Sequence, residues 1–263
     1  MHILDKIVAY KTKEIAQRKV ATPIQLLQEE AAFQLPKVSI SAHILNLETA
    51  IIAEFKRKSP SKQDINLSAN PKKVAIAYQD AGVAGISVLT DQHFFGGSFE
   101  DLQVVKKSVL IPILQKDFII DEYQIYEAKA IGADFILLIA AVLTKEQIHK
   151  FAKLAQELDL EVLVEIHTEA ELKKALCENV NLIGVNNRNL KTFEVDLAHS
   201  MQLATNIPAE FIKISESGIS STSAIKELKS AGFQAFLMGE NFMKTASPGQ
   251  TCDLFIKQLN NRI

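Results

Sequence analysis

Lysine and glutamate residues stand at the ends of short apolar segments in this sequence, and two of them have the chemistry of proton transfer. Lys116 follows the apolar segment that begins at Ile111, and Glu165 closes another. An ammonium group can donate a proton and a carboxylate can accept one, which is the basis of general acid–base catalysis. A carboxylate within an apolar segment is costly to bury unless it has a partner. Lys116 and Glu165 are therefore candidate catalytic residues.

Further polar residues occupy the same kind of position. They are Glu54, Lys56, Asn186, Arg188, Glu216 and Ser217. Glu54 and Lys56 are two residues apart, so both side chains leave the same face of a strand, and Asn186 and Arg188 have the same spacing. Ordinary solvated loop positions explain any one of these residues. They do not explain why carboxylates, lysines and an arginine recur at strand ends, and we interpret the set as a functional site.

The apolar segments themselves alternate with helix-like segments along the chain. The expected strands cover residues 50–55, 85–89, 111–114, 135–140, 161–166, 182–185, 211–214 and 235–238. The expected helices between them cover residues 71–81, 99–107, 123–130, 145–158, 169–176, 197–204 and 221–230. Strands that are apolar on both faces and alternate with helices indicate a parallel sheet covered by helices. Eight such units predict an α/β fold, the closed (β/α)₈ TIM barrel, whose functional groups stand at the carboxyl ends of the strands.

The region before the first strand has a different pattern. Apolar residues with helical spacing begin at Ile3, and Pro23 starts a second expected helix. After Pro36 the sequence is loop-like. We expect residues 1–48 to form a helical extension that caps one end of the barrel. No glycine-rich linker divides the chain, which predicts one domain over residues 1–263.

The composition favours a small-molecule partner inside the cell. The 263 residues carry a net charge of −2 without a block of like charge, so nothing favours nucleic acid or an anionic membrane. The N-terminus lacks the uninterrupted apolar core of a signal peptide, and the longest apolar run, 135–143, is too short to cross a bilayer. Cys177, in an expected helical stretch, and Cys252 lack the spacing of a disulfide framework or zinc site. We expect a cytoplasmic protein.

Metal binding is not expected from the histidines. His167 lies two residues after Glu165 and could face the same way, whereas the other histidines are scattered without ligand spacing.

The sequence also lacks the pattern of an exposed strand that could pair with a second chain, so the expected oligomeric state is a monomer.

Glycines near the last two strands indicate a phosphate site. Gly218 follows Ser217, and Gly239 precedes Glu240, where the chain leaves the seventh and eighth expected strands. In (β/α)₈ enzymes these loops often bind phosphate through backbone N–H groups and a helix N-terminus. With Lys56 and Arg188 as counter-charges, a phosphorylated substrate is the favoured ligand.

At this point the sequence resembles a known family over nearly its whole length. The segments that carry the resemblance are IIAEFKRKSPSK, SVLTDQHFFGGSFEDL, PILQKDFIIDEYQIYEAKAIGADFILLI, LVEIHTEAEL, GVNNRNLKTFEVDL, ISESGI and FLMGENFM. They look like the successive motifs of indole-3-glycerol-phosphate synthase, an enzyme of tryptophan biosynthesis. The resemblance implies a (β/α)₈ barrel that converts 1-(2-carboxyphenylamino)-1-deoxyribulose 5-phosphate into indole-3-glycerol phosphate. Carbon dioxide and water are lost, and no cofactor is used.

The resemblance also implies roles for individual residues. Lys116 would protonate the ribulose carbonyl as the aromatic carbon attacks it, and Glu165 would serve the dehydration. Lys56 would contact the substrate carboxylate, with Glu54 tuning it, and the division of proton transfer between Lys56 and Lys116 stays open. The remaining polar lining would be Asn186, Arg188, Glu216 and Ser217. The phosphate would be held by Ser59, Gly218, Gly239 and the Glu240 backbone. The anthranilate ring would be surrounded by Phe95, Phe118, Leu137, Leu190 and Met238.

The electrostatics expected for Lys116 follow from these roles. A lysine transfers a proton more readily when its pKa lies nearer neutrality, and Lys56 and Arg188 could lower it by repulsion. One departure from the family pattern concerns the loop after the first strand, where Gln63 stands at a common glycine position. It could alter the mobility of that loop.

Two alternatives stay open at this stage. One is another phosphate-binding barrel enzyme, such as phosphoribosylanthranilate isomerase, which ordinarily has a cysteine and aspartate pair. The other is a barrel that binds a phosphorylated ligand without turning it over.

Overall fold

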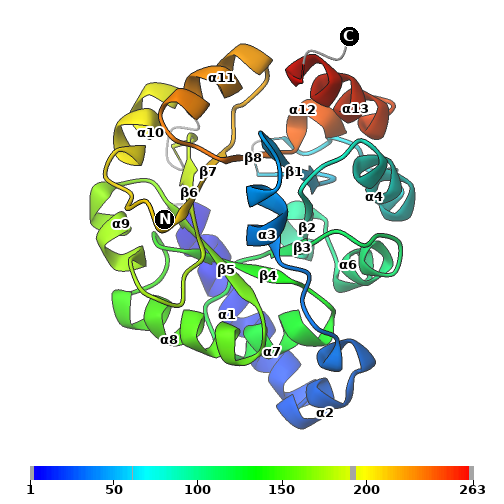
Figure 1. Ribbon diagram of the computed structural model, residues 1–263. Helices are drawn as coiled ribbons and strands as arrows, with labels where there is room; N and C mark the ends of the chain where they lie inside the picture. The colour runs from blue at the N-terminus through cyan, green and yellow to red at the C-terminus, as the bar shows by residue number, and fades with distance from the viewer. Residues whose placement is uncertain (1–2, 61, 190–193, 261–263) are drawn as a thin grey trace.

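The structure is a computed structural model that describes residues 3–60, 62–189 and 194–260. Eight parallel strands pair in chain order, and the last pairs with the first to close a barrel (Figure 1). The strands are β1 (Ala50–Phe55), β2 (Gly85–Leu89), β3 (Ile113–Lys116), β4 (Phe135–Ile139), β5 (Glu161–Ile166), β6 (Leu182–Asn186), β7 (Ile212–Glu216) and β8 (Ala235–Met238). The predicted (β/α)₈ barrel is confirmed.

Helices surround the barrel and precede it. They are α1 (Ile3–Ala21), α2 (Ile24–Glu29), the 3₁₀ helix η1 (Ala31–Gln34), α3 (Ile40–Leu45), α4 (Pro71–Asp80), α5 (Gln92–Phe95), α6 (Phe99–Lys106), α7 (Tyr123–Ala130), α8 (Lys145–Glu157), α9 (Glu169–Ala175), α10 (Leu197–Ala204), α11 (Thr222–Ser230), α12 (Glu240–Met243) and α13 (Pro248–Leu259). Many begin after a polar cap. Thr144, for example, accepts a bond from the Gln147 N–H while the Gln147 side chain accepts one from the Thr144 N–H, which satisfies two backbone donors at the start of α8. No described helix has the length and apolar character needed to cross a membrane.

Two strand boundaries differ from the prediction in a way that matters for the site. The apolar runs predicted for the third and seventh strands stop at Leu114 and Ile214, with Lys116 and Glu216 just beyond them at the strand ends. The parallel ladders continue, because Lys116 pairs in register with Leu89 and Glu216 with Asn186. The two charged residues therefore lie within the rigid sheet and not in the loops that follow.

The barrel interior explains how charges reach its mouth. Apolar side chains such as Leu114, Leu163 and Ile214 fill the interior. Because side chains alternate along a strand, the residue two positions further on points to the same side. Lys116 follows Leu114 in this way, Glu165 follows Leu163 and Glu216 follows Ile214. Each of these three strands thus carries a core residue and a charged residue on one inward face.

The amino ends of the strands are closed by α3, which the sequence analysis missed by assigning a loop after Pro36. Ile40 and Ile44, one helical turn apart, are buried against interior residues of the barrel such as Ala50 and Ile52. Ser39 caps the helix by accepting a bond from the Ala42 N–H. The helix is only six residues long, so it presents little periodicity, and its apolar pair makes sense only once the open end of the barrel exists.

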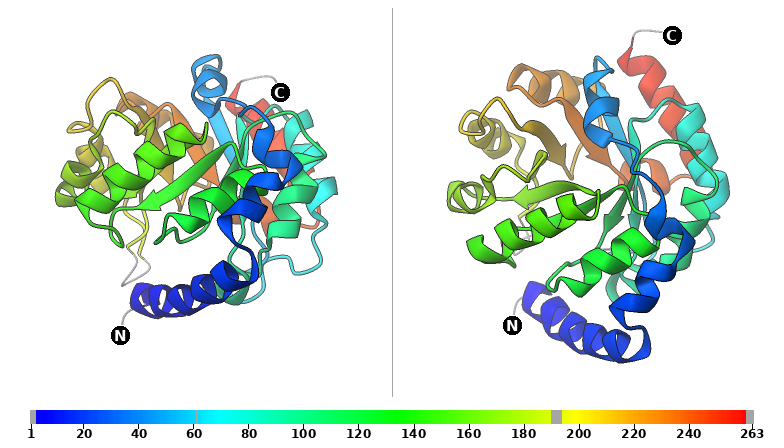
Figure 2. Two further views of the ribbon diagram at one scale, coloured as in Figure 1. Left: turned by 90° about the horizontal axis from the view of Figure 1, so that it is seen from below. Right: turned by 60° about the horizontal axis from the view of Figure 1, so that its bottom comes forward.

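The opposite end is covered by α1, as the two views in Figure 2 show. Lys11 of this helix is fully buried, and its ammonium lies 2.9 Å from Asp91 Oδ2 and 3.0 Å from Asp117 Oδ1. The two aspartates belong to the loops after β2 and β3. A second anchor is an apolar cluster that joins Ile15 to Tyr123 of α7. The extension is therefore fixed to the mouth of the barrel by a buried ion-pair network as well as by apolar packing.

This network predicts the effect of removing the Lys11 charge. Lys11→Met leaves two buried carboxylates without their cation, and we expect the free energy of unfolding to fall by about 3–5 kcal/mol. Urea unfolding measures this change. Lys13→Met, at an exposed position of the same helix, is the matched control and should change stability by less than about 0.5 kcal/mol. Equal stability of the two variants would contradict this description of α1.

Candidate active site

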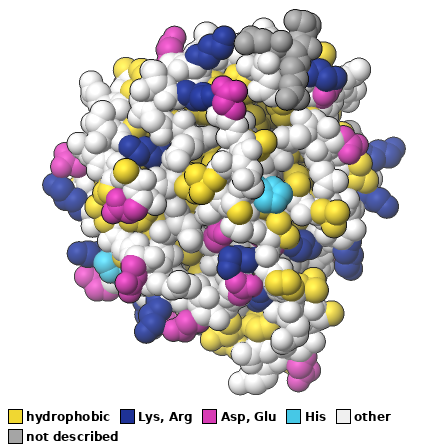
Figure 3. Space-filling view, viewed as in Figure 1, with side chains coloured by type: hydrophobic (Ala, Val, Ile, Leu, Met, Phe, Trp, Pro, Cys, Tyr) yellow, Lys and Arg dark blue, Asp and Glu magenta, His cyan; other side chains and the backbone are white. Residues whose placement is uncertain are grey.

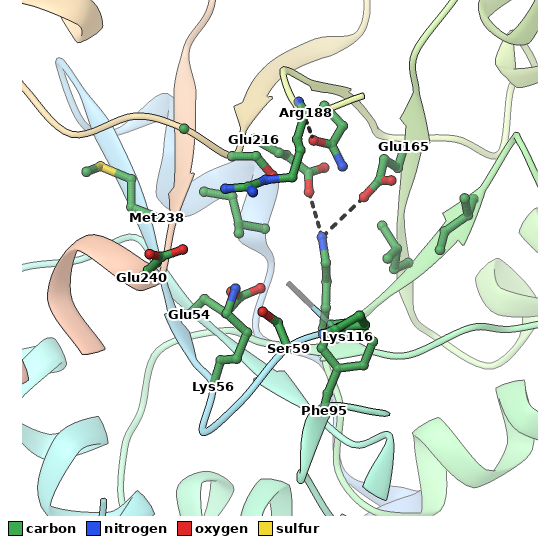
Figure 4. A pocket seen from close by; sticks show the side chains of 18 of the residues that line it. Glu54, Lys56, Ser59, Phe95, Lys116, Glu165, Arg188, Glu216, Met238 and Glu240 are labelled. Carbon is green, nitrogen blue, oxygen red and sulfur yellow. Dashed lines mark hydrogen bonds and ion pairs between the residues drawn. The ribbon is translucent and has the colours of Figure 1, made fainter. Parts of the chain in front are cut away.

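A cavity of about 330 Å³ opens at the carboxyl end of the barrel, between the strand ends and α1. Every expected site residue that the structure describes lines it, and Leu190 lies outside the described residues. The lining includes Glu54, Lys56, Ser59, Phe95, Lys116, Phe118, Leu137, Glu165, Asn186, Arg188, Glu216, Ser217, Gly218, Met238, Gly239 and Glu240. The labelled side chains in Figure 4 converge on this one space. The structure therefore brings together residues that span almost 190 positions of the sequence.

Lys116 lies at the centre of the polar groups. Its Nζ donates to Glu216 Oε2 at 2.6 Å and to Glu165 Oε2 at 3.4 Å, as the dashed lines in Figure 4 mark. Both carboxylates are almost completely buried, with 1% and 4% exposure. A buried charge without a partner is strongly destabilising. The ammonium of Lys116 is therefore what allows two carboxylates to face each other across the barrel mouth.

The pKa of Lys116 is raised, contrary to the expectation of a value nearer neutrality. Burial by itself lowers it, but the charges of Glu216, Glu165 and Glu54 outweigh burial and raise it well above its ordinary value. The expected repulsion from Lys56 is offset, because the Lys56 ammonium lies 2.5 Å from Glu54 Oε2. Lys116 thus carries its proton firmly before substrate arrives.

The two carboxylates beside Lys116 differ from each other. For Glu216, burial raises the pKa to about 7. The Lys116 charge opposes this rise, but the negative charge of Glu165 offsets part of the Lys116 attraction. Burial also favours the neutral form of Glu165, yet Lys116, His167 and a hydrogen bond from Asn186 hold its pKa below its usual range. Two carboxylates that share one ammonium cannot both ionise freely. Glu165 is the one that stays ionised and can accept a proton.

Two glycines make room for the carboxylates of Glu216 and Glu54. A Cβ atom on Gly184 would lie 2.1 Å from Glu216 Oε1, and one on Gly239 would lie 2.4 Å from Glu54 Oε2. Gly184 was not among the predicted site residues. Its signal was a glycine inside a strand, which often marks close approach of another group.

The apolar side of the cavity has a contribution that the sequence analysis missed. The rings of Phe95 and Phe118 lie with centroids 5.9 Å apart, and α1 adds Ile3, Leu4 and Ile7 to the lining. Asp91 and Asp117, the partners of Lys11, hold the two phenylalanine loops: Asp91 accepts from the Phe95 N–H and Asp117 from the Phe118 N–H. The extension therefore forms one wall of the site and supports the loops that carry the aromatic rings.

The loops after β7 and β8 have a backbone geometry suited to an anion. Ser217 and Gly218 both have left-handed backbone angles, with φ of 69° and 71°. Gly239 precedes the short helix α12, and no side chain caps its first N–H groups. Unsatisfied N–H groups at a helix start attract anions. Lys244 adds a cation to the lining that the sequence analysis did not identify.

Other expectations are corrected or limited by the structure. Cys177 lies beyond the end of α9 and not within a helix, and neither it nor Cys252 is among the described residues that line the cavity. Gln63 does not have a positive φ, so the backbone there does not require the glycine that is common in the family. Among the described residues, no three or more His, Cys, Asp or Glu side chains cluster as metal ligands would.

Comparisons with known proteins show the family of the chain. The family model described as indole-3-glycerol phosphate synthase matches residues 4–257. The chain belongs to the indole-3-glycerol phosphate synthase family. Relatives of that name include a protein of Bacteroides thetaiotaomicron, 45% identical with 98% of each chain covered. Another, from Polaromonas sp., is 44% identical, with 94% of this chain and 95% of the relative covered.

Solved structures with low sequence identity share the fold. The 3-hexulose-6-phosphate synthase of Salmonella typhimurium aligns with a TM-score of 0.62 at 14% identity, covering 82% of this chain and all of that one. KGPDC from Streptococcus mutans aligns with a TM-score of 0.61 at 15% identity, covering 82% of this chain and 99% of that one. These likenesses concern the barrel architecture.

The raised pKa of Glu216 predicts a pH-dependent effect on stability. A carboxyl whose pKa is higher in the native than in the unfolded protein destabilises the native state increasingly as the pH rises from the unfolded value toward the native one. Glu216→Gln removes that charge. We expect the variant to exceed the wild type in free energy of unfolding by roughly 2–3 kcal/mol near pH 8 and by much less near pH 5.

Urea unfolding at the two pH values measures the difference, with Glu178→Gln at an exposed position as the control. A difference between Glu216→Gln and the wild type that does not change with pH would contradict the raised pKa.

Proposed function

We propose that this chain closes the indole ring of 1-(2-carboxyphenylamino)-1-deoxyribulose 5-phosphate and releases indole-3-glycerol phosphate, carbon dioxide and water, without a cofactor. The observation that carries the proposal is the placement of a charged lysine between two buried carboxylates in a cavity with an apolar wall. Family membership supports the same reaction. The protein is then a carbon–carbon lyase of tryptophan biosynthesis.

Lys116 is the general acid in this proposal. As the aromatic carbon attacks the ribulose carbonyl, negative charge develops on the carbonyl oxygen, and the Lys116 ammonium transfers a proton to it. The raised pKa of Lys116 means that the residue enters the reaction protonated. Lys116 also lies in strand β3, so the sheet holds its backbone in place and its ammonium group is directed at a fixed point.

Glu165 is the general base. A proton must leave the intermediate when its hydroxyl group departs as water, and an ionised carboxylate in the cavity can accept that proton. The lowered pKa of Glu165 keeps the residue ionised beforehand. Glu216 holds Lys116 from the other side, and Asn186 stabilises the Glu165 carboxylate by hydrogen bonding.

Lys56 and Arg188 bind the anionic parts of the substrate. The Glu54 carboxylate orients Lys56 by an ion pair, and Lys56 can then contact the substrate carboxylate when it enters. Phe95, Phe118 and their apolar neighbours enclose the anthranilate ring. An apolar surround disfavours the carboxylate and so assists its loss as carbon dioxide.

The substrate phosphate binds at the loops after β7 and β8. Ser59, Gly218, Gly239 and the backbone of Glu240 surround this end of the cavity, with Ser217 beside them. The arrangement has the parts of a (β/α)₈ phosphate site, namely the last two loops and the start of a short additional helix. The Glu240 carboxylate lies 3.4 Å from the Lys62 ammonium, which reduces its repulsion of an anion.

The proposal includes a single-domain, monomeric protein of the cytoplasm without nucleic-acid or membrane partners. The described strands form a closed sheet, so they leave no open edge for pairing with a second chain. Both cysteines are free thiols, which fits a reducing compartment. On the face in Figure 3, basic and acidic side chains are interspersed, and such a surface gives no electrostatic footprint for nucleic acid.

An assay of the purified protein tests the proposal. Addition of the carboxyphenylamino-deoxyribulose phosphate should produce the fluorescence of the indole product. Lys116→Ala and Glu165→Gln should each lower kcat by about 10²–10⁴-fold, because each removes one acid–base group. Lys145→Ala, at an exposed position of α8, should retain wild-type activity. A wild-type protein without indole fluorescence, or a fully active Lys116→Ala variant, would overturn the assignment.

A further inference from the structure

Lys11 of α1 is a buried cation that the proposed chemistry does not use. Its side chain is 1% exposed, and it is not among the described residues that line the cavity. Besides Asp91 and Asp117, its Nζ atom lies 2.8 Å from Glu14 Oε2. Burial lowers the pKa of Lys11, but the charges of Asp117 and Asp91 outweigh burial and raise it. The ammonium therefore keeps its charge at neutral pH and holds two loops of the barrel mouth at once.

The loop after β2 is organised by Asp91 into one unit. The Oδ1 atom of Asp91 accepts the Phe94 and Phe95 N–H groups at 2.7 and 3.3 Å, which caps the start of α5. Its backbone carbonyl accepts the Gly97 N–H at 2.9 Å, just beyond the end of α5. Gly97 in turn lies so close to β2 that a Cβ atom there would be 1.9 Å from the Leu89 carbonyl oxygen. Both ends of the short helix thus depend on Asp91, and a shift of Asp91 moves the Phe95 ring with it.

The loop after β3 is held by Asp117 in a similar way. The Oδ1 atom of Asp117 accepts the Phe118 N–H at 2.7 Å and lies 3.0 Å from the Lys11 ammonium. Its Oδ2 atom accepts the hydroxyl group of Thr90, the residue before Asp91, at 2.7 Å. The two loops are therefore connected twice, once through Thr90 within the barrel and once through Lys11 of the extension.

Each of these loops carries one ring of the aromatic wall of the cavity. The Phe95 and Phe118 rings lie with centroids 5.9 Å apart and planes inclined by 37°. We propose that Lys11 is a positioning residue that sets the placement of these two rings, and thereby the affinity of the site for the aromatic part of its substrate. Lys11 does this without touching the substrate. The inference rests on the proposed function, in which the anthranilate ring binds against this wall.

The expected effect is on binding and not on the chemical step. Lys116 precedes Asp117, but it pairs in register with Leu89 inside the sheet, so its backbone stays in place when the loop beyond it shifts. The phosphate end of the cavity, at the loops after β7 and β8, has no direct link to Lys11 among the described contacts. A contact that is equally strong in the ground state and the transition state changes KM and leaves kcat unchanged. Loss of the Lys11 charge should therefore raise KM and weaken the binding of aromatic ligands.

The test compares two destabilising changes within the same helix. Lys11→Met removes the cation, whereas Ile15→Ala weakens the apolar cluster that joins α1 to Tyr123 and leaves the cation in place. Both are assayed at a temperature at which circular dichroism shows them to be folded. In Lys11→Met we expect KM and the inhibition constant of indole-3-glycerol phosphate to rise by about tenfold, with kcat within about threefold of the wild type. Ile15→Ala and the exposed Lys13→Met should keep wild-type values.

A ligand without a ring separates the two ends of the cavity. Glycerol 3-phosphate can occupy only the phosphate end, so its inhibition constant should be the same in every variant. Asp91→Asn breaks the same link in a second way, and it carries the same expectations if Lys11→Met does not fold. The amide retains the oxygen that caps α5 but turns an N–H donor toward the Lys11 ammonium.

Several results would overturn the inference. One is a wild-type KM and wild-type product affinity in folded Lys11→Met or Asp91→Asn. Another is an equal loss of affinity in Ile15→Ala or for glycerol 3-phosphate, which would indicate a general loosening of the extension. A lower kcat with unchanged KM would place the effect at Lys116 instead of the rings. These three results leave the proposed function intact, whereas a wild-type protein that forms no indole product would overturn both.

Discussion

The ion pairs of Lys116 with Glu165 and Glu216 are the interaction on which the site depends. Two carboxylates that are both nearly inaccessible to solvent can ionise in one place only if a cation lies between them. The result is an unequal pair, in which Glu165 remains a base and Glu216 is shifted toward its neutral form. A proton donor and a proton acceptor are thereby held a few ångströms apart, both charged before the substrate enters.

The rest of the molecule makes this arrangement rigid. The strands end in register, so the charged residues occupy one layer above an apolar interior. Helix α3 closes that interior at the amino ends of the strands, and α1 covers it at their carboxyl ends. Through Asp91 and Asp117, Lys11 links the covering helix to the loops that carry Phe95 and Phe118. The cavity lining and the fold of the extension are therefore parts of one network.

The sequence predicted the barrel and most of the cavity lining, because both follow from local patterns: continuous apolar runs that alternate with helix-like segments, and polar residues at the ends of those runs. It did not predict features that depend on distant partners. The Ile40 and Ile44 pair of α3 has meaning only beside the open barrel, and the three apolar residues of α1 reach the site only through tertiary packing. The predicted direction of the Lys116 pKa shift was also wrong, because it is decided by the charges of Glu216, Glu165 and Glu54, whose distances from Lys116 no spacing in the sequence reveals.

The central claim is that Lys116 enters catalysis as a firmly charged ammonium. A pH titration of the lysine side-chain ¹⁵N signals by NMR tests it most directly, with Lys116→Met used to assign the resonance. The account predicts that Lys116 remains protonated beyond the ordinary lysine pKa of about 10.4, and that Glu216→Gln brings its titration to lower pH. A Lys116 signal that titrates near neutrality in the wild-type protein would contradict the account.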